Sequence, residues 1–181
     1  MHLERILPPV CLCLAVLTAP VHGSEVRLGM TRAEFGQVLV ANGSRLISDV
    51  SNVVAVRGSV PEVEFERYKF VRSPLDSQMV LWQASTVYRF PASPAMFDSV
   101  AASLEAQHGV PTSSRGEFDR LGKPFGLHER VWQDAVTTAQ LATRWEAEPQ
   151  LATDRMMLSR TELRLALLAR ASLARRDRKR R

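Results

Sequence analysis

The alternation of hydrophobic and polar residues predicts that the chain begins its fold with a helix. Apolar residues recur at helical spacing from Phe35 onward. Thr31 and Glu34 have the spacing of a capping box, in which each residue satisfies a backbone N–H of the other. Gly43 suits a left-handed residue after the last turn. The pattern therefore predicts a helix over 32–42.

Short segments typical of strands follow this helix. The segment 53–56 is β-branched, and 63–70 alternates apolar with charged residues, with a one-residue slip typical of a β-bulge. The segment 79–90 has the pattern of a long strand or a bent pair. Turn-forming residues at 58–61 and 73–77 separate these segments. The first half thus reads as a helix followed by about three strands.

A second helix is predicted directly after this strand region. Ser93 is a favourable N-cap and Pro94 fits the first helical position. Apolar residues then keep helical spacing over 97–108. Gly109 and Pro111 end the helix, because proline cannot continue it.

Strand-like segments follow the second helix as they follow the first. They lie at 130–133, 136–145 and 151–158, after a loop-like stretch at 112–129. We therefore predict an α+β fold, with an antiparallel sheet built from two α-β-β-β units over 24–91 and 92–158. Tandem duplication and chance similarity of layout both remain open, because few residues are identical between the halves.

The last apolar segment predicts a C-terminal helix over 159–174. Ser159 and Glu162 have capping-box spacing, and a leucine-rich face follows over 163–168. The residues 175–181 are almost all basic. We expect this tail to be disordered.

The basic tail changes how the net charge of +5 is interpreted. Seven of the 24 basic residues lie within 170–181, beside a single acid, Asp177, so the rest of the chain is close to neutral. A nucleic-acid-binding domain spreads basic residues over one face, and we expect no nucleic-acid partner. Contact of the tail with an anionic membrane surface is the alternative role. The residues that would make this contact are Arg175, Arg176, Arg178, Lys179, Arg180 and Arg181.

The first 23 residues have the layout of a secretory signal peptide. Arg5 precedes an apolar stretch at 6–19 that is too short to span a bilayer. Val21 and Gly23 then occupy the −3 and −1 positions of a cleavage site before Ser24. An N-terminal anchor or a buried helix is the alternative. Arginine greatly outnumbers lysine, which suggests a GC-rich bacterial genome, so we expect a periplasmic or secreted protein.

The chemistry available to such a protein is limited. Both cysteines lie within the expected signal peptide, so the mature chain would form no disulfide or thiolate metal site. His108 and His128 lack the spacing of a zinc site, and no nucleophile elbow, P-loop or dinucleotide motif occurs. We expect no cofactor, no metal and no enzymatic activity. A hydrolase that uses His128 and an unrecognised serine is the alternative, because catalytic triads assemble in space.

Two short motifs carry a resemblance to a known family. Gly29-Met30-Thr31 followed by Glu34 resembles the helix start of small exported bacterial domains, and the segment from His108 to Pro111 resembles the Tyr-Gly-x-Pro that closes their helices. The chain is therefore similar to β-lactamase-inhibitor-protein-like domains and to the small lipoprotein of outer-membrane assembly. The resemblance implies helix-then-strands units in tandem and a non-enzymatic scaffold that presents a concave sheet to a partner. The chain departs from the family at 42–45, where Gly-x-Pro is missing, and in lacking a lipid-attachment cysteine after the signal.

Aromatic residues on the predicted strands are the candidate partner-binding set. Their large apolar surfaces could line a groove, although strand aromatics more commonly pack in the core. The set consists of Trp82, Tyr88, Trp132 and Trp145. The expected function is contact with another protein, such as another envelope protein, or with the cell envelope. Anchoring to the envelope surface by the basic C-terminal helix is the alternative.

Overall fold

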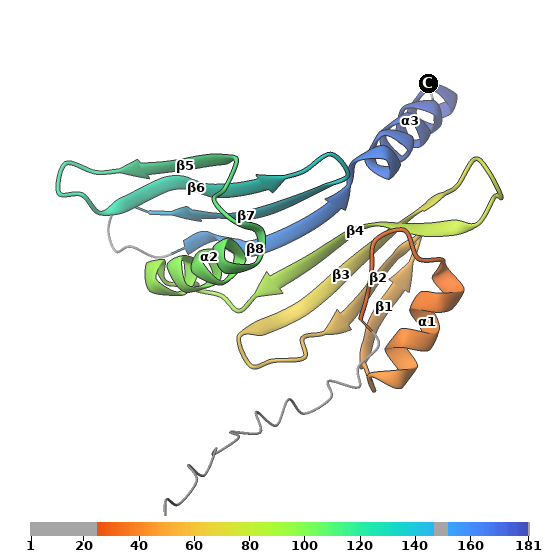
Figure 1. Cartoon of the computed structure of the whole chain (residues 1–181), viewed down its shortest axis with the longest axis horizontal. Coiled ribbons are helices and arrows are strands. Elements are labelled where there is room, and N and C mark those ends of the chain that lie inside the picture. The colour runs from red at the N-terminus through yellow and green to blue at the C-terminus, as the bar shows by residue number, and fades with distance from the viewer. Residues whose placement is uncertain (1–24, 147–151, 181) are drawn as a thin grey trace, which may run out of the picture.

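The computed structural model describes residues 25–146 and 152–180 (Figure 1). The expected signal peptide and Arg181 lie outside the described residues. The first half consists of α1 (Arg32–Ala41), β1 (Leu46–Val50), β2 (Val53–Arg57), β3 (Val63–Arg72) and β4 (Met79–Tyr88). The second half consists of α2 (Pro94–His108), β5 (Ser113–Phe118), β6 (Pro124–Gln133), β7 (Thr137–Trp145) and β8 (Ala152–Glu162), and is followed by α3 (Leu163–Arg180).

All eight named strands form one antiparallel sheet in the order β1-β2-β3-β4-β8-β7-β6-β5. β4 and β8, the last strands of the two halves, pair at the centre and join them. The predicted α+β class, the antiparallel sheet and the C-terminal helix are confirmed. Each of the first two helices is followed by four strands, and tandem duplication of the two halves stays a prediction.

The two helix starts follow the local sequence chemistry. The side chain of Thr31 accepts a hydrogen bond from the Glu34 amide, and the Glu34 carboxylate accepts one from the Thr31 amide, so the predicted capping box is present. These backbone and side-chain hydrogen bonds from Thr31 lower the pKa of Glu34. Ser93 caps α2 by accepting from the Met96 amide.

Both α1 and α2 cover the same face of the sheet, which we call the helix face. Cross-strand partners point to one face, and Tyr68, Ala84, Arg160, Ala139 and Trp132 are successive partners across β3, β4, β8, β7 and β6. The β3 and β4 members of this row pack in the cluster of Phe35 on α1. The β7 and β6 members pack in the cluster of Phe97 on α2.

The opposite side of the sheet, which we call the open face, carries α3 at one end. Leu165 and Ala169 of α3 pack there on Val71 and Val80. Figure 1 shows α3 projecting beyond the end of the sheet. No helix in the part of the chain that the structure describes is long and apolar enough to cross a membrane.

Two sequence predictions about the second half of the sheet were wrong. The stretch 112–129 was expected to be a loop, but most of it forms β5 and the start of β6. The segment from Ser159 to Glu162 belongs to β8, because hydrogen bonds to both β4 and β7 outweigh its helix-capping pattern. The Glu162 carboxylate still accepts a hydrogen bond from the Leu165 amide at the start of α3.

The basic tail was expected to be disordered, but α3 continues through Arg180. Arginine and lysine are good helix formers, and their charges interact favourably with the C-terminal end of the helix dipole. The basic side chains are therefore displayed on a helix.

Candidate functional site

Arg160 on β8 lies near the middle of the helix face, in the space between α1 and α2. Its cross-strand partners are Ala84 on β4 and Ala139 on β7, whose short side chains leave room around it. Arg160 lines three adjoining hollows on this face. No hydrogen bond or ion pair engages its guanidinium within residues 25–146 and 152–180. This arginine is therefore an uncompensated cation at the junction of the two halves.

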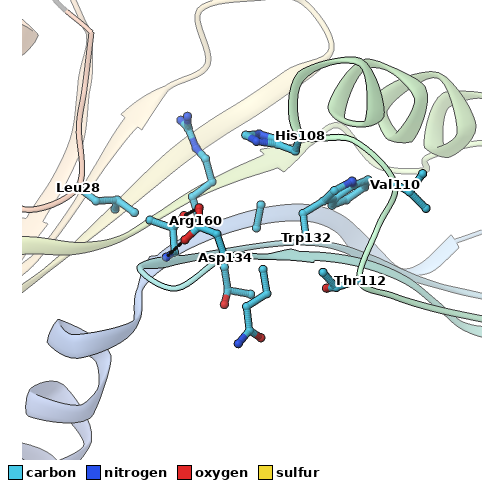
Figure 2. A pocket seen from close by; sticks show the side chains of 11 residues that line it. Leu28, His108, Val110, Thr112, Trp132, Asp134 and Arg160 are labelled. Carbon is cyan, nitrogen blue, oxygen red and sulfur yellow. Dashed lines mark hydrogen bonds between the residues drawn. The ribbon is translucent and has the colours of Figure 1, made fainter.

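The first of these hollows is a pocket of about 170 Å³ between the two halves. Figure 2 shows the side chains of Arg160 and His108 extending into the same space, with Leu28 on the other side and Trp132 beneath α2. The Trp132 indole Nε1 donates to the carbonyl oxygen of Gly109 at 2.9 Å, which ties the end of α2 to β6. The pocket thus combines an apolar wall with cationic and imidazole groups.

Two further hollows extend from Arg160 along the helices. One, of about 980 Å³, has Glu66 and Tyr68 in its floor, and the other, of about 340 Å³, runs beside α2 past Tyr88. Burial raises the pKa of both tyrosines, and Tyr68 also donates a hydrogen bond to Glu66. Both tyrosines are therefore neutral phenols, and Arg160 supplies the positive charge here.

The acidic group that lines the pocket, Asp134, has a structural role. The Asp134 carboxylate accepts hydrogen bonds from the Val136 amide and from the amide and hydroxyl of Thr137, at 2.6–3.0 Å, and so closes the β6–β7 hairpin. The two backbone hydrogen bonds are the main reason that the pKa of Asp134 is lowered. A carboxylate held in this way is a poor general base.

His128, the candidate for a hydrolase, is also in a structural environment. Its Nε2 lies 2.8 Å from the carbonyl oxygen of Glu117, to which it must donate. Its ring is buried among the rings of Phe97, Phe118 and Trp145, with centroids 5.2–6.3 Å away. No group of acidic, histidine and cysteine side chains that could hold a metal ion occurs among the described residues.

The open face presents a different chemistry, arranged in three cross-strand rows. The first row contains Arg57, Phe65, Val87, Met157, Ala142, Glu129 and Arg115, the second contains Ala55, Arg67, Ser85, Ser159, Gln140, Val131 and Ser113, and the third contains Val53, Lys69, Gln83, Thr161, Thr138 and Gln133. Beyond the first row, a hollow of about 490 Å³ is lined by Arg57, Glu64, Arg89, Phe90 and Arg155. Basic side chains thus outnumber acidic ones on this face, although the chain outside its basic end is close to neutral.

The centre of the open face contains buried polar groups, two of which have no hydrogen-bond partner. The hydroxyls of Ser85 and Ser159 share a hydrogen bond of 3.1 Å and are buried. The Nε of Arg67 and the Oε1 of Gln83 are buried without a hydrogen-bond partner. Burial, and then the charge of Arg67, lowers the pKa of Lys69. The free protein therefore holds its central cations at an energetic cost.

The structure places three of the four residues of the predicted aromatic set in the core. Tyr88, Trp132 and Trp145 are buried in the core beneath α2, and Trp132 and Tyr88 also line hollows on the helix face. Their strand register turns them to the helix face, where α2 covers them. Trp82 is half-buried and packs beside α3. Five of the six basic residues named at the C-terminus lie on α3 and are exposed, and the sixth, Arg181, is outside the described residues.

Sequence reasoning did not single out Arg160, Arg67 or Lys69. The sequence does contain a signal for Arg67 and Lys69, because these residues alternate with Tyr68 and Phe70 along one strand and so define the second face of that strand. Arg160 was assigned to a helix, which concealed its place in the sheet.

Comparison with family models, curated proteins and solved structures finds no match for this chain. The resemblance to β-lactamase-inhibitor-like domains therefore stays a prediction.

Proposed function

We propose that this protein is an exported, non-catalytic binding protein that recognises an acidic protein surface with the open face of its sheet. The observation that carries the proposal is the excess of basic side chains on a sheet face that neither α1 nor α2 covers. Complementary charge across an interface steers association and excludes wrong partners. An acidic protein is thus the partner that this surface fits best.

The middle of the open face supports the same choice. Arg67 and Lys69 lie side by side on β3, each with an energetic reason to accept an acidic neighbour. A partner carboxylate beside Arg67 and Lys69 would offset the repulsion between the two cations. Rigid strands hold both side chains in place, which keeps the ordering cost of binding low.

The breadth of the surface favours a macromolecule over a small ligand. The three rows run from β2 to β6, and two of them reach β5, so the face is a wide platform and not a closed cavity. The resemblance to domains that present a sheet to a protein partner points the same way. Asp134 and His128 both form hydrogen bonds to the backbone that hold the fold together, and this favours a non-catalytic role for the protein.

A pair of photo-crosslinking variants in the native host tests this proposal. A photoreactive residue at Gln140, exposed on the open face, should capture a defined adduct, whereas the same residue at Gln37, exposed on α1, should not. Replacing Arg67 and Lys69 by glutamine should reduce the Gln140 adduct about tenfold, and added salt should reduce it in the unmodified protein. Equal adducts from both positions, or no effect of the double replacement, would refute the open face as the binding surface.

The C-terminal helix supports a second candidate, attachment to an anionic membrane surface. Every residue from 170 to 180 is exposed, and the basic side chains point in several directions around the helix. Each basic residue near an anionic surface contributes about 1 kcal/mol. Sedimentation with vesicles containing anionic lipid should bring down the protein, but not a variant with glutamine at Arg175, Arg176, Arg178 and Lys179. Equal sedimentation of both, or sedimentation with neutral vesicles, would reject this role.

A further inference from the structure

We infer that the pocket on the helix face binds a carboxylate attached to a small apolar group, with the Arg160 guanidinium as its anchor. This inference is independent of the proposed function, because its anchor Arg160 lies on the helix face, whereas Arg67 and Lys69 lie on the open face.

The first support is the state of Arg160 itself. Within residues 25–146 and 152–180 its guanidinium has no acidic partner. Glu25 and Glu66 line a hollow with it, and Glu66 already accepts a hydrogen bond from Tyr68. Asp134 is occupied by its hairpin turn. A planar guanidinium held without an acceptor is suited to a two-point hydrogen bond with a carboxylate.

The second support is the character of the pocket walls. Leu28, Trp132 and Ala139 supply the apolar part of the lining, beside polar side chains of the β6–β7 hairpin. The Trp132 indole N–H is committed to the Gly109 carbonyl oxygen, so the ring offers the ligand an apolar contact and no donor. His108 faces the same space and adds a second polar contact near Arg160. One charged end and one apolar body therefore describe the ligand.

The third support is size. At about 170 Å³ the pocket is smaller than the sites of most drug-sized ligands. It fits a short branched acid or the terminal residue of a longer molecule, whose remainder would extend into the hollows that also reach Arg160. A free small acid and the C-terminus of a polypeptide share this chemistry.

Titrations of the full-length ¹⁵N-labelled protein, followed by the Trp132 indole N–H signal, test the assignment in a buffer without carboxylate or phosphate. Isobutyrate should shift this signal saturably, and isobutyramide, its neutral isostere, should not. Arg160→Gln should weaken isobutyrate binding at least about tenfold. Arg164→Gln, a matched replacement of an exposed arginine on α3, should leave it unchanged.

The remaining arms identify the source of the carboxylate. A short peptide ending in leucine should bind about tenfold more tightly than isobutyrate if the natural ligand is a polypeptide terminus, and its C-terminal amide should then lose that gain. Equal affinities for the peptide and for isobutyrate would identify a free small acid.

Three results would overturn the inference. They are a shift of the same size with isobutyramide, binding of inorganic phosphate as tight as that of isobutyrate, and no saturable shift with either acid. The comparison of isobutyrate with isobutyramide uses the unaltered protein, so it decides the matter even if Arg160→Gln fails to fold.

Discussion

The hydrogen bond between Ser85 and Ser159 links the two halves of the sheet, and its removal gives a sharp test of the structure. The serines are cross-strand partners on β4 and β8, their hydroxyl oxygens lie 3.1 Å apart, and they are only 3% and 4% exposed. Replacing one serine by alanine leaves the other hydroxyl buried without its partner. A stranded group of this kind costs about 1–3 kcal/mol, whereas removal of both partners is close to neutral.

We therefore expect Ser85→Ala and Ser159→Ala each to lower the free energy of unfolding by about 1.5 kcal/mol. The double variant should lose less than the sum of the two by at least about 1 kcal/mol. Urea unfolding, followed by circular dichroism and tryptophan fluorescence, measures all four proteins. Ser103→Ala, which removes an exposed serine from α2, is the matched control and should change stability by less than about 0.5 kcal/mol. Additive losses in the double variant would show that the two hydroxyls do not depend on each other.

Three further predictions concern stability and can be measured in the same urea series. Gly36→Ala should stabilise the protein by about 0.5–1 kcal/mol, because Gly36 lies inside α1 with open space at its Cβ position. Gly58→Ala should destabilise it, because a Cβ there would meet a backbone carbonyl oxygen at 2.3 Å, and equal effects at the two glycines would contradict this. Lys69→Met should be more stable than the unaltered protein at neutral pH. The pKa of Lys69 is lower in the folded protein than in the unfolded chain, so the charge of Lys69 opposes folding below the folded-state pKa. The unaltered protein should therefore regain stability as the pH rises toward 10.5. A difference in unfolding free energy between the two proteins that stays constant with pH would refute this. Leu141→Ala should cost about 3 kcal/mol because Leu141 is 0% exposed, whereas Leu167→Ala, at 64% exposure, should cost less than about 0.5 kcal/mol, and similar losses would be inconsistent with the described core.

The first two helices could be predicted because their signals are local. Thr31, Glu34, Ser93 and Pro94 act on backbone groups within one turn, so the sequence around them suffices. The edge strands β1 and β5 were missed for the opposite reason. Neither strand has a buried residue, so no alternation of apolar and polar positions marks it. An edge strand is specified mainly by the neighbour with which it pairs.

The candidate site could be predicted only in part, because it depends on register. The segment from Ser159 to Glu162 carries a genuine capping pattern, and only pairing with two distant strands makes it a strand. That pairing also turns Arg160 toward α1 and α2. The aromatic residues on β4, β6 and β7 could be assigned to strands, but which face they occupy follows from how those strands align.

The central pairing of β4 with β8 has a consequence for the order in which the fold is completed. β4 is rich in apolar residues, yet its final neighbour begins only at Ala152. Until that segment arrives, β4 pairs only with β3, and its other edge is an exposed hydrophobic edge that is prone to pair with other chains. Sequence-distant pairing of this kind slows folding. A chain of this topology is best kept unfolded until nearly all of it is available, as happens when a polypeptide is translocated after synthesis.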